Sequence, residues 1–191
     1  MQIRMLLSTV KIEVSNILLT KSFSILILTW GVINATGMYF MITGEEEFGG
    51  RYPNPELLIG IIGEAFSVLG IFLVIFYSGE LMWKSRTSKF HELLYTTPIS
   101  NFAYLVSKYV VLSLIIIVIL TLGVLIGLIY QLINSYPPSI VEFLSTYYYF
   151  GLPVMLVACF AVFIQVIVPN RYVGMIITAA IVLFFGPMAQ Q

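Results

Sequence analysis

Five apolar runs constrain the fold of this chain more than any other feature of its sequence. A helix needs about 20 mostly apolar residues to span a bilayer, because lipid cannot satisfy backbone N–H and C=O groups. The fifth run is short and interrupted by Gly186 and Pro187, so it is either a span cut off near its end or a re-entrant segment. The sequence predicts an all-α, polytopic membrane protein with about five transmembrane helices, at residues 24–43, 57–79, 109–133, 147–168 and 172–188.

Composition and charge agree with this class. Of the 191 residues, 60% are hydrophobic and 9% are charged, whereas about a quarter of a typical soluble domain is charged. The net charge is zero, which gives no support for a nucleic-acid partner, because binding to phosphates needs clustered basic residues. Membrane lipids are the expected surroundings. We find no internal repeat and no soluble domain, so residues 1–191 are interpreted as a single transmembrane domain.

The first 23 residues do not have the pattern of a signal peptide, because Lys11, Glu13 and Lys21 interrupt the apolar run. They are instead amphipathic, with one apolar and one polar helical face: Ile3, Leu7, Val10 and Val14 against Arg4, Ser8, Lys11 and Ser15. This pattern predicts a helix lying in the membrane interface. The alternative is an ordinary amphipathic helix packed on a neighbour.

The basic residues predict the orientation, since Lys and Arg near the ends of spans favour the cytoplasmic side. Only Arg51 lies on the other side, in a loop rich in Glu. The other eight basic residues fall on one side of the predicted spans: Arg4, Lys11, Lys21, Lys84, Arg86, Lys89, Lys108 and Arg171. The N-terminus and the loop at residues 80–108 are therefore predicted to be cytoplasmic.

Few polar residues lie within the spans. Asn34 and Gln131 are interpreted as hydrogen-bond partners between helices rather than as substrate ligands. Glu64 is the one carboxylate inside an apolar region, where an acidic group costs about 2.5–3.5 kcal/mol at the bilayer centre. It is either a functional residue or a side chain that reaches water near the outer surface. It shares a helical face with small residues, which predicts close packing in the bundle or across a dimer seam: Gly60, Gly63, Ser67 and Gly70.

The stretch HELLY, which begins at His91, resembles a zinc-protease motif that lacks its second His. A catalytic zinc needs about three ligands from His, Cys, Asp or Glu, but Tyr95 occupies the fifth position and the chain has no other His and no Asp. No Gly-Lys pair of a phosphate-binding loop occurs either. We therefore predict no catalytic residue, no metal and no cofactor, and expect the chain not to be an enzyme.

The same stretch predicts a short amphipathic helix on the cytoplasmic side, from about residue 83 to residue 97. Thr97-Pro98 ends it, since Pro disfavours helical geometry in the residue before it. Its apolar face carries Trp83, Thr87, Phe90 and Leu94, and its polar face carries Ser85, Ser88, Lys89 and Glu92. Such a helix either covers the inner end of the bundle or presents its polar side to a cytosolic partner.

Residues 79–111, GELMWKSRTSKFHELLYTTPISNFAYLVSKYVV, resemble the loop between the second and third spans of type 2 ATP-binding-cassette (ABC) transporter permeases. The matching features are Glu80, Arg86, the Glu-Leu-Leu at 92–94, the Thr-Pro-Ile-Ser at 97–100 and Lys108. The form with Trp83 and His91-Glu92 looks similar to bacterial permeases that carry a gluzincin-type aminopeptidase domain further along the polypeptide. Elsewhere the resemblance rests on the order of the spans.

The resemblance implies a permease subunit of an ABC exporter in the plasma membrane, which is the inner membrane of a bacterium. A second permease unit, identical or different, would complete the pathway, and a cytosolic ATPase would dock on the 83–97 helix as the coupling helix. The contact candidates on that helix are Arg86, Lys89, His91 and Glu92. Six spans are usual in this family, so a sixth is missing here and we expect the domain to be incomplete at its C-terminus.

Two other readings remain open from the sequence. The spans would be the membrane anchor of a larger polypeptide whose downstream metallopeptidase domain performs the chemistry, or a secondary carrier or assembly factor that works without ATP. A complete H-E-x-x-H motif beyond Gln191 would favour the first of these. Co-purification of an ATPase with the chain would exclude the second.

Overall fold

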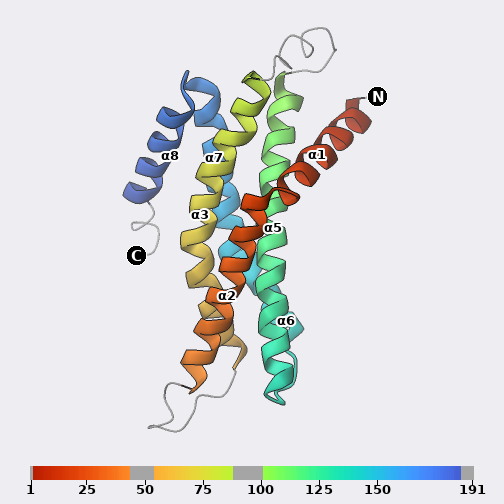
Figure 1. Cartoon of the computed structure of the whole chain (residues 1–191), viewed down its shortest axis with the longest axis vertical. Coiled ribbons are helices and arrows are strands. Elements are labelled where there is room, and N and C mark those ends of the chain that lie inside the picture. The colour runs from red at the N-terminus through yellow and green to blue at the C-terminus, as the bar shows by residue number, and fades with distance from the viewer. Residues whose placement is uncertain (1, 44–53, 88–100, 186–191) are drawn as a thin grey trace. The chain divides into compact units, whose positions relative to one another are not determined.

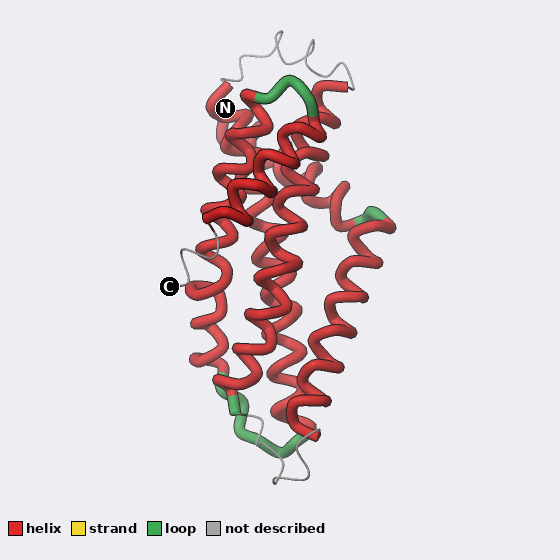
Figure 2. The backbone as a smooth tube through the Cα atoms, turned by 90° about the vertical axis from the view of Figure 1, so that its left-hand side faces the viewer, coloured by secondary structure: helices red, strands yellow, loops and turns green. Residues whose placement is uncertain are grey.

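The structure, a computed structural model, describes residues 2–43, 54–87 and 101–185, and every regular element in these ranges is helical. The prediction of an all-α fold is confirmed, and Figure 2 shows helices joined by short loops in the described residues. Figure 1 labels the elements along the chain. They are α1 (Gln2–Leu18), α2 (Lys21–Thr43), α3 (Pro55–Thr87), α5 (Asn101–Ile133), α6 (Ile140–Thr146), the π-helical turn η2 (Tyr147–Gly151), α7 (Leu152–Ile167) and α8 (Arg171–Phe185).

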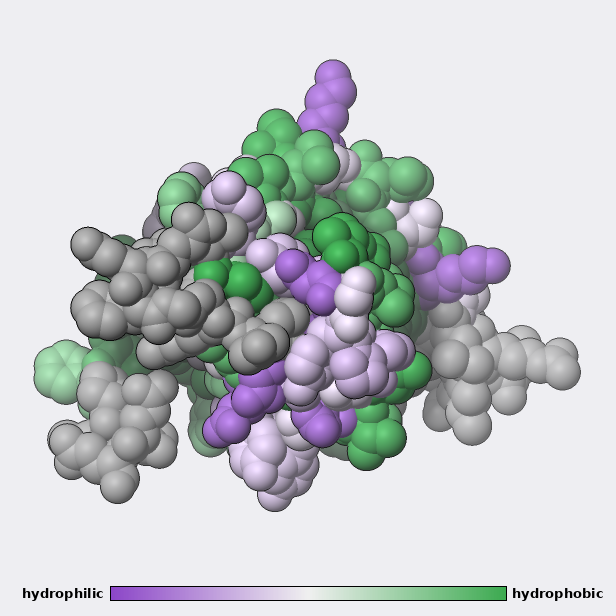
Figure 3. All heavy atoms as spheres, turned by 90° about the horizontal axis from the view of Figure 1, so that it is seen from below, coloured by the Kyte–Doolittle hydropathy of each residue, from purple (hydrophilic) through white to green (hydrophobic). Residues whose placement is uncertain are grey.

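Four helical stretches are long and apolar enough to cross a membrane: Lys21–Phe40, Pro55–Trp83, Phe102–Ile133 and Ile140–Ile167. They match the first four predicted spans. The fifth prediction coincides with α8, an apolar helix of only 15 residues. Large apolar side chains are exposed on all of these helices, for example Leu28, Val68 and Phe160. Such exposure is expected for a multi-pass protein surrounded by lipid. Figure 3, which views one end of the molecule, shows hydrophilic residues beside apolar ones there.

The second and third spans extend further toward the segment that joins them than the sequence predicted. α3 continues from the expected end at residue 79 to Thr87, and α5 begins at Asn101 rather than at residue 109. Each has 33 residues and is therefore about 50 Å long, against about 30 Å for the hydrocarbon core. Residues 83–87 of the predicted coupling helix thus belong to α3, and the rest of it lies outside the described residues.

The fourth span begins earlier than predicted. Helix starts at Ile140, and Tyr147, Tyr148 and Tyr149 lie in η2, inside the span rather than at its boundary. The predicted span at residues 147–168 therefore omits the apolar turns of α6. Tyr148 and Tyr149 are exposed, while Tyr147 shares a 2.9 Å hydrogen bond with Thr121 of α5.

Local side-chain chemistry explains where several helices begin and end. α2, α3 and α8 follow Thr20, Asn54 and Asn170, whose side-chain oxygens accept hydrogen bonds from the N–H groups of Phe23, Glu56 and Tyr172. α5 ends in a Schellman motif, since the N–H of Tyr136 bonds to the carbonyl of Gln131 at 2.9 Å and that of Ser135 to the carbonyl of Leu132 at 3.2 Å. Ser135 has the left-handed φ of 57° that this motif requires.

The chain forms two compact units. Unit 1 consists of Met1–Ile17, Gly70–Ile115 and Val154–Gln191, and unit 2 consists of Leu18–Leu69 and Ile116–Pro153. Unit 1 therefore holds α1, α3 from Gly70 onward, α5 as far as Ile115, and most of α7 with α8. Unit 2 holds α2, the remaining parts of α3 and α5, and the α6–η2 stretch.

Unit 2 is packed by aromatic rings that occupy notches left by glycines. A Cβ on Gly123 of α5 would lie 2.5 Å from the Trp30 ring of α2, and one on Gly127 would lie 2.8 Å from the Phe143 ring of α6. The Trp30 and Phe143 side chains are buried. Because glycine has no side chain, the helix backbone can receive a ring from the neighbouring helix at these positions. Gly123 and Gly127 form a Gly-x-x-x-Gly pattern on α5, which thus serves packing within this unit.

Candidate functional site

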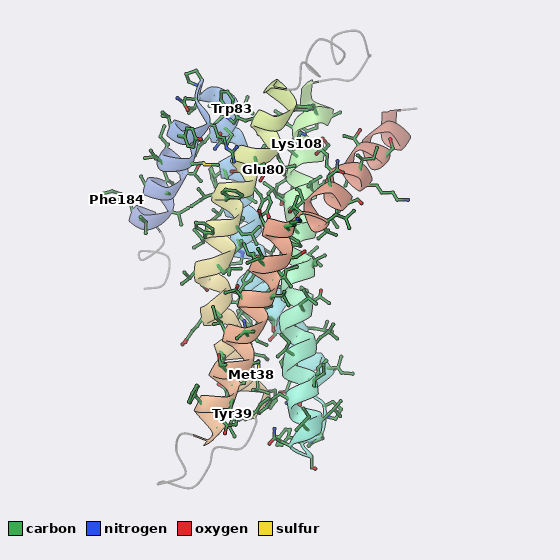
Figure 4. The ribbon with its side chains drawn as sticks, viewed as in Figure 1. Met38, Tyr39, Glu80, Trp83, Lys108 and Phe184 are labelled. Atoms are coloured by element: carbon green, nitrogen blue, oxygen red, sulfur yellow. The ribbon has the colours of Figure 1, made fainter. Side chains whose placement is uncertain are left out.

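The helices on either side of residues 88–100 are both fixed within unit 1 by polar side-chain contacts. Figure 4 labels Glu80 and Trp83 near the end of α3, and Lys108 in the first third of α5. The sequence predicts a docking helix for a cytosolic partner at residues 83–97, and its first residues, 83–87, lie in α3. We therefore treat the end of α3, the start of α5 and the groups that hold them as the candidate site.

The start of α5 is held to α1 by an ion pair. The Lys108 Nζ contacts the Glu13 Oε1, and the two side chains are only 1% and 20% exposed. The ammonium also lies 4.9 Å from the centre of the Tyr104 ring, a favourable position over a π face. Lysine is rarely buried unless it is paired, so the carboxylate of α1 and the ring of α5 together allow Lys108 to be buried.

The end of α3 is held to α7 by a hydrogen bond. The indole Nε1 of Trp83 donates to the Gln165 Oε1 at 3.2 Å, and Gln165 is fully buried. The sequence placed Trp83 on the apolar face of a separate cytoplasmic helix, whereas the structure places it in α3 with its polar atom turned to α7. A hydrogen bond inside a membrane span is retained because lipid offers no competing partner.

α8 packs on the same part of α3. A Cβ on Gly79 would lie 2.3 Å from the Met175 Cε of α8. The Arg171 guanidinium, in the first turn of α8, lies 5.7 Å from the centre of the Phe76 ring of α3. Within unit 1, α1 is thus held to the start of α5. α7 and α8 are both held to the end of α3.

The predicted contact residues for a partner lie at or beyond the end of α3. Arg86 is in its last turn. Lys89, His91 and Glu92 lie outside the described residues. Their role in docking therefore stays a prediction.

The intramembrane polar candidates occupy three different environments in unit 2. The Asn34 Nδ2 donates to the Trp30 carbonyl of its own helix at 2.9 Å, so this bond does not link two helices. The Gln131 Oε1 accepts from the Ser139 N–H at 3.2 Å and so joins α5 to the start of α6. Glu64 is exposed on α3.

The small residues that share a helical face with Glu64 lie in different surroundings. Gly63 is buried against the Phe150 ring, whereas a Cβ on Gly60 would meet nothing within 4 Å. The part of the face that carries Gly63 therefore packs within unit 2. The part that carries Gly60 and Glu64 is open in the single chain.

The described residues contain no group of three or more His, Cys, Asp and Glu side chains that could hold a metal ion. Cys159 is exposed on α7. What the described part of the site offers is mechanical: a buried ion pair and a buried hydrogen bond that connect helices around one segment.

Sequence reasoning did not single out Glu13 or Gln165 as site residues. In the sequence Glu13 stands out only as an interruption of an apolar run, and Lys108 only as one of the basic residues that predict the orientation and as part of the loop motif. One signal for Gln165 was present, because it is the only amide or charged residue in α7 (LPVMLVACFAVFIQVI). Its partner could not be read from the sequence, because Trp83 is 82 positions away.

Comparison with known proteins identifies a family that matches this chain. The model of a family described as ABC-2 family transporter protein matches residues 3–190, nearly the whole chain. No curated protein and no solved structure matches the chain. The matched range includes every helix that forms the candidate site.

Proposed function

The chain belongs to the ABC-2 transporter family, and on this premise we propose that it is the permease subunit of an ATP-driven exporter. Membership makes it the multi-pass membrane component of an ABC transporter, which is not the catalytic component. ATP hydrolysis is assigned to a separate cytosolic ATPase subunit. A second permease unit completes the pathway, and the host membrane is the plasma membrane, the inner membrane of a bacterium.

The observation that carries the proposal is the way unit 1 holds the two helices that flank residues 88–100. Trp83 bonds α3 to α7, and Lys108 bonds α5 to α1. Packed helices move as rigid elements because their interfaces do not deform continuously. A force applied to the docking segment therefore displaces several helices of unit 1 rather than one loop.

In the proposed cycle, closure of the ATPase on ATP pushes on the docking segment and tilts the ends of α3 and α5. The polar residues Arg86, Lys89, His91 and Glu92 are the proposed contacts with the ATPase. Both helices also contribute residues to unit 2, where the intramembrane candidates Asn34 and Glu64 lie. Movement at the cytoplasmic end is in this way communicated to the membrane pathway.

The docking assignment predicts that the double variant R86A/E92A binds its ATPase poorly. Loss of two polar contacts at an interface should weaken binding by tenfold or more, and permease-stimulated ATP hydrolysis should fall with it. Co-purification and ATPase turnover in nanodiscs measure both. The matched control R51A/E56A removes one positive and one negative charge from the opposite side of the membrane and should leave both readouts unchanged. Full stimulation by R86A/E92A at normal expression would refute the assignment.

The orientation predicts that residues 44–56 are external. In a C159A background, which lacks the native exposed thiol, an E46C variant should react with a membrane-impermeant maleimide on intact cells. An S88C variant should react only after permeabilisation, because the 80–108 loop is cytoplasmic. The reverse pattern would invert the topology and remove the basis for docking at residues 83–97.

A further inference from the structure

Gln165 is a fully buried amide near the end of an apolar helix. Its side chain is 0% exposed, and it is the third residue from the C-terminal end of α7, which ends at Ile167. An amide in a membrane span must find its hydrogen-bond partners within the protein, because lipid supplies none. The position of each amide atom therefore shows what the side chain connects.

The amide oxygen faces α3. Gln165 Oε1 accepts the hydrogen bond from the Trp83 Nε1 at 3.2 Å. One turn earlier on α3, a Cβ on Gly79 would lie 3.4 Å from the Gln165 Nε2. The Gln165 amide thus lies against the turn of α3 from Gly79 to Trp83. Trp83 is also the first residue of the predicted docking helix.

The same amide lies against the backbone of α8. A Cβ on Gly174 would be 2.6 Å from the Gln165 Oε1 and 2.8 Å from its Cδ. Cβ atoms do not approach other heavy atoms so closely, so only glycine leaves room for the amide at this point. Gly174 is buried, and its carbonyl accepts a 2.8 Å hydrogen bond from the buried Thr178 hydroxyl.

We propose that Gln165 is a positioning residue for energy coupling, which holds α7 and α8 to the cytoplasmic end of α3. Displacement of α3 by the ATPase then moves the three helices together. The proposal rests on the function proposed above and extends it to a residue that is distant in sequence from the docking helix but bonded to its first residue. Gln165 Nε2 is buried and meets no acceptor among the described residues, so both of its N–H groups are left for a carbonyl that moves toward the amide during the cycle.

Trp83 itself reports on this contact. The chain has two tryptophans, so W30F leaves Trp83 as the only indole. Q165M keeps the length of the side chain and removes the amide. In the purified permease, Q165M should shift the emission maximum of Trp83 by changing the hydrogen bonding of its N–H. Unchanged emission in W30F/Q165M would overturn the proposed contact.

Coupling is measured on the complex with the ATPase that co-purifies with the wild-type chain. Trapping the nucleotide with vanadate should change Trp83 emission in W30F but not in W30F/Q165M. ATPase stimulation should fall about threefold to tenfold in Q165M, the range that corresponds to one lost hydrogen bond. The control T178V removes a neighbouring buried hydroxyl whose bond stays within α8, and it should retain coupling.

A mutant cycle with Gly174 covers the case in which Q165M fails to fold. G174A should reduce coupling strongly in the wild type, because its methyl group would overlap the amide. The same change should have little further effect in a Q165A background, where the amide is gone; equal effects in both backgrounds would overturn the proposal. If no ATPase binds the wild-type chain, the proposed function falls. If it binds and Q165M stimulates it fully, only the role of Gln165 falls.

Discussion

Replacement of Glu13 by alanine is expected to destabilise the chain by about 3–5 kcal/mol, because it leaves the Lys108 ammonium buried without its carboxylate. Lys108 is 1% exposed and Glu13 is 20% exposed. K108M should also be destabilising, because it leaves the Glu13 carboxylate without its counter-ion, and the Glu13 Oε2 is itself buried without a hydrogen-bond partner among the described residues. The π face of Tyr104, 4.9 Å from the ammonium, offsets part of the cost in E13A.

Thermal unfolding of the detergent-solubilised chain, followed by size-exclusion chromatography, measures the stability of these variants against the wild type. E13A should lower the midpoint on the order of 10 °C. The double variant E13L/K108M should recover most of the loss, because apolar residues of similar size often replace a buried ion pair without cost. The control K11A, at an exposed position of the same helix, should change stability by less than about 0.5 kcal/mol. An E13A variant that melts like the wild type would show that the ion pair does not hold α1.

G63A is expected to cost about 1–3 kcal/mol or more, because a methyl group at this position would overlap the end of the Phe150 ring. Three ring atoms of Phe150 lie 2.0, 2.3 and 2.4 Å from the ideal Cβ position. A phenylalanine ring has only two rotatable bonds, so it must leave its notch on α3 to relieve the overlap. Loss of this packing would weaken the contact between α3 and the η2 turn, to which Phe150 belongs.

Gly60 provides a matched control on the same helix. A Cβ there would meet nothing within 4 Å, so G60A should be neutral or should stabilise the isolated chain by up to about 1 kcal/mol through helix propensity. F150L should partly rescue G63A. Equal melting midpoints for G60A and G63A would contradict the packing described for unit 2. A loss of activity in G60A that appears only in the assembled transporter would place a second chain on this open part of α3.

The two glycines illustrate what helical periodicity predicts and what it does not. Periodicity places Gly60, Gly63 and Glu64 on one side of α3 and predicts close packing there. It cannot tell which edge of that side meets a neighbour, because the answer depends on the rotation of α3 against the η2 turn. The fourth span shows the same limit, since the sequence predicts its start at residue 147 and the helix begins at Ile140.

The sequence by itself determined the class of the protein, the positions of the four long apolar helices and the segment that resembles a permease loop. These are local properties, because the length and hydropathy of a run decide whether it can cross a bilayer. Only the tertiary structure decided which polar side chains meet. Glu13 and Lys108 are 95 positions apart, and Trp83 and Gln165 are 82 apart. Such pairs form because buried polar groups need a partner, and helix packing alone determines which partner lies within reach.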